Sequence, residues 1–165
     1  TVGKKGYEEH EELMKHISRL SIGQQELFVE YIDRDSEAYD RVFGCFKLPK
    51  TTDEEKAARS AAIQEATRFA ALIPMQVARN ACELMEIIAD VARLGNRNAI
   101  TDACVAMMAA RSAVLGALLN VRINLASLKD TAFVDELKRE ACRLEQLACT
   151  REKELLEVVN QELNQ

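Results

Sequence analysis

Residues 99–128 read AITDACVAMMAARSAVLGALLNVRINLASL and form the most apolar region of the chain. Apolar residues fall on every side of the helix that this segment predicts, among them Met107, Met108, Leu118 and Leu119. A helix that is apolar on all sides is surrounded by protein. We therefore expect an all-α fold, a multihelical bundle or array in which residues 99–128 form the buried central helix.

One side of this predicted helix carries small residues, which permit the close approach of another helix from the same or a second subunit. This seam consists of Ala106, Ala109, Ala113, Gly116 and Ala117, and it continues into Asn120, Asn124 and Ser127. Buried amides need hydrogen-bond partners. The two asparagines therefore either join packed helices or contact a ligand.

The remaining sequence predicts three further helical stretches, over about 8–45, 52–94 and from 131 onward. Thr52 and Glu55 fit a capping box at the start of the second stretch. Pro74 predicts a kink or a restart within it, because proline removes a backbone donor. Thr101–Asp102 and Asp130 are expected to cap the last two helices.

Composition restricts the class of protein. The 165 residues fit one domain, and the net charge of −5 offers no basic face for nucleic acid. No uninterrupted apolar run approaches the roughly 20 residues of a membrane span, and no signal peptide is visible. We therefore expect a cytoplasmic protein without a nucleic-acid or membrane partner.

The cysteines and histidines point away from redox and metal chemistry. The five cysteines lack C-x-x-C spacing and lie in helical patterns, so we interpret all of them as reduced core residues. The two histidines, His10 and His16, fall on different helix faces. Without a cluster of ligand spacing, no metal site is expected.

Asp35 is the most informative single residue. At about 100° per residue it falls in the middle of an otherwise apolar stripe made of Phe28, Ile32, Tyr39, Val42 and Phe46. One interpretation is a structural carboxylate paired with Arg111 or Arg122. The other is a desolvated carboxyl with a raised pKa, suited to general acid/base catalysis.

The polar residues elsewhere also have two interpretations. Asp102 is stabilised by the helix dipole if it lies in a first turn, without any further role. Asn120 and Asn124 can serve as helix-to-helix hydrogen bonders. Lys5 and Tyr7 can belong to a frayed terminus.

Three stretches carry a family resemblance: DRDSEAYDRVFGCFKLPKTTDEEKAARSAAIQEA, ARLGNRNAITDA and GALLNVRINLASLKD. They contain D-x-D-x-E-A, L-P-K-x-T-x-E-E-K, G-N-x-x-x-x-x-D and N-V-x-I-N-L in register, and they resemble the cyclodeaminase/cyclohydrolase family of folate enzymes. The resemblance implies a multihelical array around a buried helix. It also implies conversion of 5-formimidoyltetrahydrofolate to 5,10-methenyltetrahydrofolate with release of ammonia, while some relatives hydrolyse the methenyl compound instead.

The resemblance also implies roles for individual residues. The second aspartate of D-x-D, the family's proposed acid/base group, is Asp35. Asn120, Asn124 and Asp102 are implied to face the folate, and Lys5 and Tyr7 to lie near it. No metal or cofactor is implied beyond the folate itself, and Arg122 is expected to be a structural ion-pair partner.

The resemblance extends to assembly and domain organisation. Residues 1–165 correspond to one helical domain that begins after the family's Gly-rich turn and first helix. The implied partners are the reduced folate, a second copy in a homodimer or dimer-based oligomer, and a formiminotransferase. The alternative from another class is a non-catalytic helical interaction module.

Overall fold

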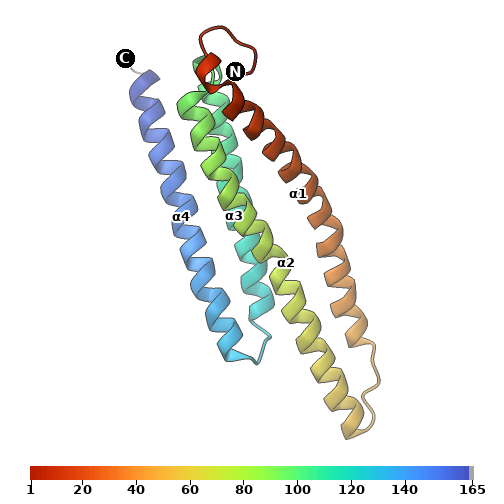
Figure 1. Cartoon of the computed structure of the whole chain (residues 1–165). Helices are drawn as coiled ribbons and strands as arrows, with labels where there is room; N and C mark the ends of the chain where they lie inside the picture. Colours follow the sequence, from red (N-terminus) through yellow and green to blue (C-terminus); the bar gives the residue numbers. More distant parts are fainter. Residues whose placement is uncertain (164–165) are drawn as a thin grey trace.

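The computed structural model describes residues 1–163, which are helical over most of their length. Four long helices occur in these residues, α1 (Glu11–Phe46), α2 (Asp53–Leu94), α3 (Ile100–Leu125) and α4 (Thr131–Leu163), with short 3-10 turns η1 (Glu8–His10) and η2 (Arg97–Ala99). The helices lie side by side in an up-and-down arrangement (Figure 1). No strand occurs in the described residues, so the predicted all-α multihelical fold is confirmed.

Helix α2 packs against the other three long helices, whereas α3 packs mainly against α2 and α4. Met107, Val114 and Leu118 of α3 are fully buried, but Leu119 and Ile123 on another side are 64% and 73% exposed. Within the single chain the expectation that α3 is buried on all sides is therefore wrong. Helices α2 and α4 cover only one side of α3, and its opposite apolar side is open.

The segment Arg97–Leu125 is long and apolar enough to span a membrane, with a mean hydropathy of 1.7 over its most apolar window. The core helix of a soluble protein has the same properties. Arg111 and Arg122 of this helix form ion pairs with Glu152 and Glu145 of α4. We therefore interpret the segment as a core helix.

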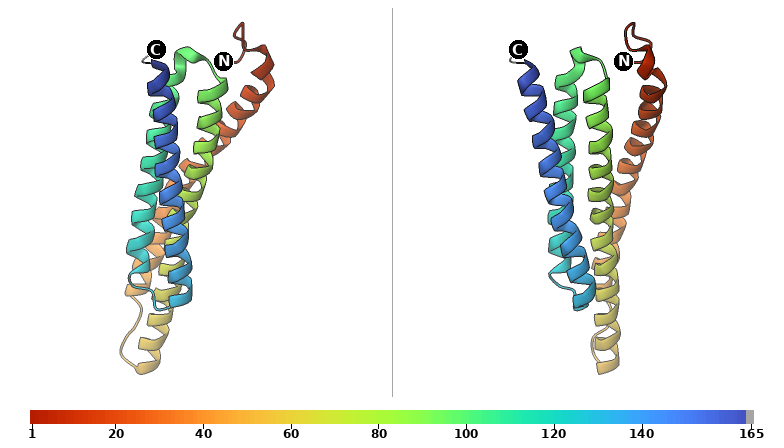
Figure 2. Two further views of the ribbon diagram at one scale, coloured as in Figure 1. Left: turned by 90° about the vertical axis from the view of Figure 1, so that its left-hand side faces the viewer. Right: turned by 60° about the vertical axis from the view of Figure 1, so that its left-hand side comes forward.

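The hydrophobic core lies between α2, α3 and α4. Large side chains such as Met75, Met85, Met107 and Leu118 are fully buried there, and alanines on each helix permit close contact. A second, smaller cluster joins α1 to α2 through Tyr31, Ala38, Ala70 and Ile73. Figure 2 shows α1 inclined away from the other helices toward its N-terminal end, although Met14 and Ile17 in that part are buried.

The helix boundaries mostly follow the sequence signals. The Thr52 hydroxyl accepts a hydrogen bond from the Glu55 amide, and the Glu55 carboxylate accepts one from the Thr52 amide, which confirms the capping box. The Asp130 carboxylate accepts a bond from the amide of Phe133 at 3.1 Å, which confirms that cap. Helix α2 continues through Pro74 without a restart.

The predicted cap at Thr101–Asp102 is wrong. Helix α3 begins at Ile100, its N-cap is Ala99, and no side chain caps it. The turn η2 leads directly into α3 and is capped by the side chain of Asn96, which accepts a bond from the amide of Asn98. Asp102 therefore lies inside the first turn of α3, where its charge complements the helix dipole.

Substitution of Met107 by alanine should destabilise the chain by about 2–5 kcal/mol, because a fully buried methionine is replaced by a cavity. The neighbouring Met108 is 41% exposed, so Met108→Ala is a matched control that should cost less than about 1 kcal/mol. Urea unfolding followed by circular dichroism measures both. Equal losses would contradict the burial assigned to α3.

The ion pair between α2 and α4 should make stability depend on pH in the acid range. Arg79 donates two hydrogen bonds to Glu140, at 2.8 and 2.5 Å, and this contact lowers the pKa of Glu140 below its ordinary value. A carboxylate whose pKa is lowered by folding stabilises the fold above its unfolded pKa, and this stabilisation disappears as the pH falls through the folded pKa. In Glu140→Gln the free energy of unfolding should therefore fall less steeply as the pH is lowered, which urea unfolding between neutral and acid pH measures. An unchanged curve would show that this pair contributes nothing.

Candidate functional site

Asp35 lies on α1 and is exposed in the single chain. Its predicted stripe is only partly buried: Phe28 and Val42 are half-buried against α2, but Ile32 is 65% and Tyr39 66% exposed. The desolvation expected from the sequence is therefore not provided by these four helices, and that expectation is wrong for the single chain. The residues of α1 that pack against α2 are instead Tyr31 and Ala38, which lie one helical turn before and after Asp35 and on an adjacent side of the helix.

The alternative structural interpretation of Asp35 is also wrong. Arg122 pairs with Glu145 at 2.5 Å and Arg111 with Glu152 at 3.1 Å, so both proposed partners are directed toward α4. The expectation that Arg122 forms a structural ion pair is confirmed. Asp35 thus presents its carboxylate on the surface of α1 without either arginine.

Contacts between α1 and α2 show which flank of their junction Asp35 occupies. Phe46 follows Asp35 by about three helical turns and so lies on nearly the same line of α1. The Arg59 guanidinium of α2 lies over the Phe46 ring, 5.6 Å from its centroid. The opposite flank is occupied by Arg41, which contacts Glu65 and Phe69 of α2. Asp35 therefore lies on the Arg59 flank.

The asparagines of α3 lie toward the same flank of α2. The Asn124 amide donates a hydrogen bond to the Ala70 carbonyl of α2 at 3.2 Å and another to the Asn120 carbonyl at 3.1 Å. Ala70 also packs in the cluster with Ala38 and Tyr31 of α1. Helix α1, which carries Asp35, and helix α3, which carries Asn124, therefore both contact α2 at the level of Ala70. Asn120, one turn earlier, is exposed.

Asp102, Lys5 and Tyr7 lie at the other end of the molecule. The Tyr7 hydroxyl accepts a hydrogen bond from the Arg97 amide at 3.1 Å, and Lys4 donates to the Asn96 side chain at 2.6 Å. These contacts hold the N-terminal segment against the α2–α3 connection, beside the first turn of α3. Asp102 and Asn120 are separated by about 27 Å along α3. The single chain therefore does not bring the predicted substrate-binding residues into one site.

Apart from Ala117, which is buried, the small residues of the α3 seam are open in the single chain. Ala106, Ala109, Ala113 and Gly116 are exposed, and a Cβ atom added at Gly116 would meet nothing within 4 Å. Asp102 and Asn120 lie on this same side of α3, at its two ends, because 18 residues make five full turns. The seam thus connects the two groups of predicted site residues along one face.

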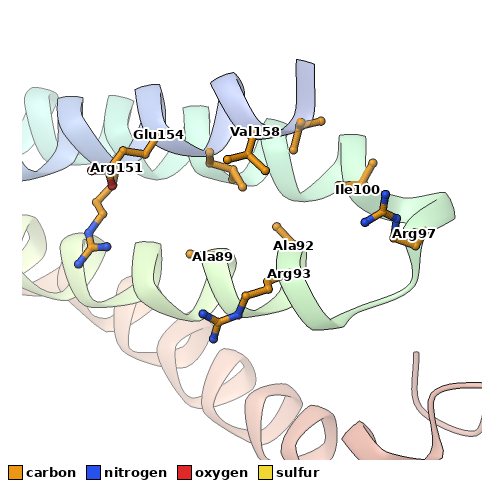
Figure 3. Close-up of a pocket in the computed structure, with 10 residues that line it drawn as sticks. Ala89, Ala92, Arg93, Arg97, Ile100, Arg151, Glu154 and Val158 are labelled. Carbon is orange, nitrogen blue, oxygen red and sulfur yellow. The ribbon is translucent and has the colours of Figure 1, made fainter. Parts of the chain in front are cut away.

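A pocket that the sequence analysis did not identify lies at the end of the molecule that carries the α2–α3 connection (Figure 3). It has a volume of about 270 Å³, an apolar floor that includes Ala92, Ile100 and Val158, and arginines at its rim. Arg93 and Arg151 pair with Asp90 and Glu86 at 2.7 and 2.6 Å. The positive charge at this rim is thus largely neutralised.

A second pocket missed by the sequence analysis lies where α2 begins, on the Arg59 flank. It has a volume of about 300 Å³ and is lined by Lys50, Lys56, Arg59, Ser60, Ile63 and Gln64. Gln64 also holds the α3–α4 turn, because its amide donates to the Ser127 carbonyl at 2.9 Å and its carbonyl accepts from the Lys129 amide at 2.8 Å. The L-P-K-x-T-x-E-E-K motif contained the signal for this pocket, since it supplies Lys50 and Lys56.

The five cysteines differ in burial, and Cys45 is half-buried. Cys82 and Cys104 are buried, and burial raises the pKa of both thiols. Cys142 and Cys149 are exposed on α4, so the expectation that all five are core residues is wrong for these two. Within residues 1–163 no group of three or more His, Cys, Asp and Glu side chains is arranged to hold a metal ion.

Comparison with known proteins gives consistent matches over the chain. Residues 1–143 match the family described as formiminotransferase-cyclodeaminase. The chain is 39% identical to methenyltetrahydrofolate cyclohydrolase of Methylorubrum extorquens, over 99% of this chain and 79% of that protein. It is 29% identical to formimidoyltransferase-cyclodeaminase of Rattus norvegicus, over 92% of this chain but only 28% of that longer protein.

A solved structure is similar across the same region. The crystal structure of formiminotetrahydrofolate cyclodeaminase from Thermotoga maritima superimposes with a TM-score of 0.81 at 26% identity, covering 95% of this chain and 76% of that one. The likeness extends over all four long helices.

Proposed function

Because the chain belongs to the formiminotransferase-cyclodeaminase family, we propose that it acts on the one-carbon unit at N5 and N10 of tetrahydrofolate. The observation that carries this proposal is the 39% identity to a methenyltetrahydrofolate cyclohydrolase along nearly the whole chain. That identity favours hydrolysis of 5,10-methenyltetrahydrofolate to 10-formyltetrahydrofolate as the reaction.

The second candidate reaction is the cyclodeamination expected from the sequence. It would close 5-formimidoyltetrahydrofolate to the methenyl compound with loss of ammonia, and the fold it shares with a cyclodeaminase supports it. A protein of this second kind would be an ammonia-lyase and would depend on a formiminotransferase for its substrate. In either case we expect a cytoplasmic enzyme of one-carbon metabolism that needs no metal or cofactor besides the folate.

Both reactions can use one carboxyl group. In hydrolysis, Asp35 accepts a proton as water adds to the bridging carbon, and it returns a proton to N5 as the carbon–N5 bond breaks. In cyclodeamination, it accepts the proton from N10 as N10 adds to the formimidoyl carbon, and it protonates the departing amine. A positioned carboxyl typically contributes 10²–10⁴-fold to such proton transfers.

Two assays on the purified chain decide between the reactions. Loss of methenyltetrahydrofolate absorbance measures hydrolysis, and coupled detection of ammonia from 5-formimidoyltetrahydrofolate measures cyclodeamination. A non-catalytic interaction module would show neither activity, and it would also show no saturable thermal stabilisation by a reduced folate. That result would overturn the proposal.

Asp35→Asn should keep the fold and lose about 10²–10⁴-fold of the turnover, because an amide cannot transfer the proton. Asp33→Asn is the matched control, since Asp33 is exposed two residues away on the same helix. Turnover and melting temperature are measured for both variants. If Asp33→Asn is the inactive variant, Asp35 is not the acid/base residue.

We further propose that the open seam of α3 forms a homodimer interface. An exposed row of small and apolar residues of this length is typical of a protein contact. The exposed positions run from Val105 to Ile123 and are centred near Ala113. A two-fold axis at that centre would make the α3 helices antiparallel and place Asp102 of one subunit opposite Asn124 of the other. The two ends of the predicted site would then meet across the interface.

Gly116→Leu tests this interface. The single chain has room for the added side chain, so its fold should survive, but a two-fold contact would receive the obstruction twice. We expect loss of the dimer in sedimentation velocity, together with loss of most turnover. Gly23→Leu is the control, because Gly23 is a helical glycine of α1 with equally open surroundings. A wild-type chain that sediments as a fully active monomer would exclude this arrangement.

A further inference from the structure

The pocket at the start of α2 is lined mainly by cationic and neutral polar side chains. Lys50, Lys56 and Arg59 converge on it, and Ser60 and Gln64 add neutral hydrogen-bonding groups. The pocket belongs to the part of α2 and of the α1–α2 connection that projects beyond the α3–α4 turn (Figures 1 and 2). A ligand can therefore reach it from solvent.

The cations of this pocket are available to a ligand. Lys50 takes part in no ion pair within residues 1–163, and Lys56 pairs only with Asp53 at 2.8 Å, in a contact whose side chains are 58% and 93% exposed. Exposed pairs of this kind contribute little. Arg59 uses two donors on the Phe46 carbonyl, at 3.3 and 3.1 Å, which leaves the remaining guanidinium donors free to bind.

The nearby acidic residues are partly committed to the helix start. The Glu55 carboxylate accepts bonds from the amides of Thr51 and Thr52, at 2.7 and 3.1 Å. Hydrogen bonds from its own backbone amide and, to a lesser extent, from the Thr52 side chain lower the pKa of Glu54. These capping contacts hold both carboxylates at the N-terminus of α2.

Exposed aromatic side chains follow Asp35 along α1 toward the start of α2. Tyr39 and Phe43 stack with their ring centroids 6.2 Å apart and the planes inclined by 7°, and they are 66% and 51% exposed. Lys47 lies over the Phe43 ring at 4.8 Å, and Arg59 over the Phe46 ring. Flat apolar surface followed by cations suits an aromatic ring that carries carboxylates.

We propose that this surface binds the aminobenzoyl-glutamate tail of the folate, with the ring along Tyr39 and Phe43 and the carboxylates at Lys50, Lys56 and Arg59. This inference rests on the proposed function, because it takes Asp35 as the position of the reacting nitrogens. The lengths agree: Asp35 and Phe46 are roughly 16 Å apart along α1. An aminobenzoyl ring, its amide and a glutamate cover most of that span, and the long lysine and arginine side chains cover the rest.

The test compares two substrates of the proposed reaction, one with the glutamate and one in which the tail ends at the aminobenzoate. Lys50→Gln and Arg59→Gln should each raise KM for the glutamate-bearing substrate roughly tenfold, the effect of losing one charge-assisted hydrogen bond, with kcat retained. For the truncated substrate KM should not change. Lys153→Gln is the control, because Lys153 is 75% exposed on α4 and distant from this pocket.

The outcomes separate this inference from the proposed function. If the wild-type chain neither turns over nor binds any reduced folate, the proposed function fails. If the wild-type chain is active but the pocket variants leave KM unchanged, or raise it equally for both substrates, the tail site is wrong while the function stands. If Arg59→Gln disturbs the end of α1, Lys50→Gln still tests the site.

A further variant, Phe43→Ser, tests the aromatic row. If it changes the molecular mass measured by sedimentation and leaves KM unchanged, the row is a contact between copies of the chain, which also overturns the tail site.

Discussion

The contact between α2 and α3 is the interaction on which the rest of this chain depends. Methionines and leucines from both helices fill the core between them, and α4 closes it from a third side. Helix α1 is attached to α2 through a much smaller cluster around Ala38 and Ile73. The three-helix core therefore provides the rigid support, and α1 carries Asp35 on a helix whose other sides remain open.

The sequence predicted the local structure well because helix signals are local. The capping box at Thr52 and the cap at Asp130 depend only on residues within one turn, and both are present. The Thr101–Asp102 cap failed because Asn96 starts a 3-10 turn just before it, and periodicity cannot distinguish such a turn from the helix that follows. Pro74 is tolerated within α2, a case in which the tertiary environment overrides a local preference.

The site was harder to predict because burial is a property of the whole assembly. The apolar stripe around Asp35 is real in the sequence, but α2 covers only the edge marked by Tyr31 and Ala38. The basic pocket at Lys50 and Arg59 arises where a loop folds back onto α2, and no periodic pattern predicts that approach. The partners of Arg111 and Arg122 could not be read from α3 alone, since they lie on α4.

The exposure of Asp35 and the exposure of the α3 seam can be explained together. Closing a site around its ligand expels bulk water and strengthens the electrostatic interactions inside it, and this chain alone leaves Asp35 in solvent. The same chain leaves an apolar seam uncovered that ends in Asp102 at one end and Asn120 and Asn124 at the other. Covering that seam with a second copy would remove apolar surface from water and also enclose the flank on which Asp35 and Asn124 lie. Assembly and desolvation of the site would then be one event, so a variant that prevents assembly should lose catalysis even with every site residue intact.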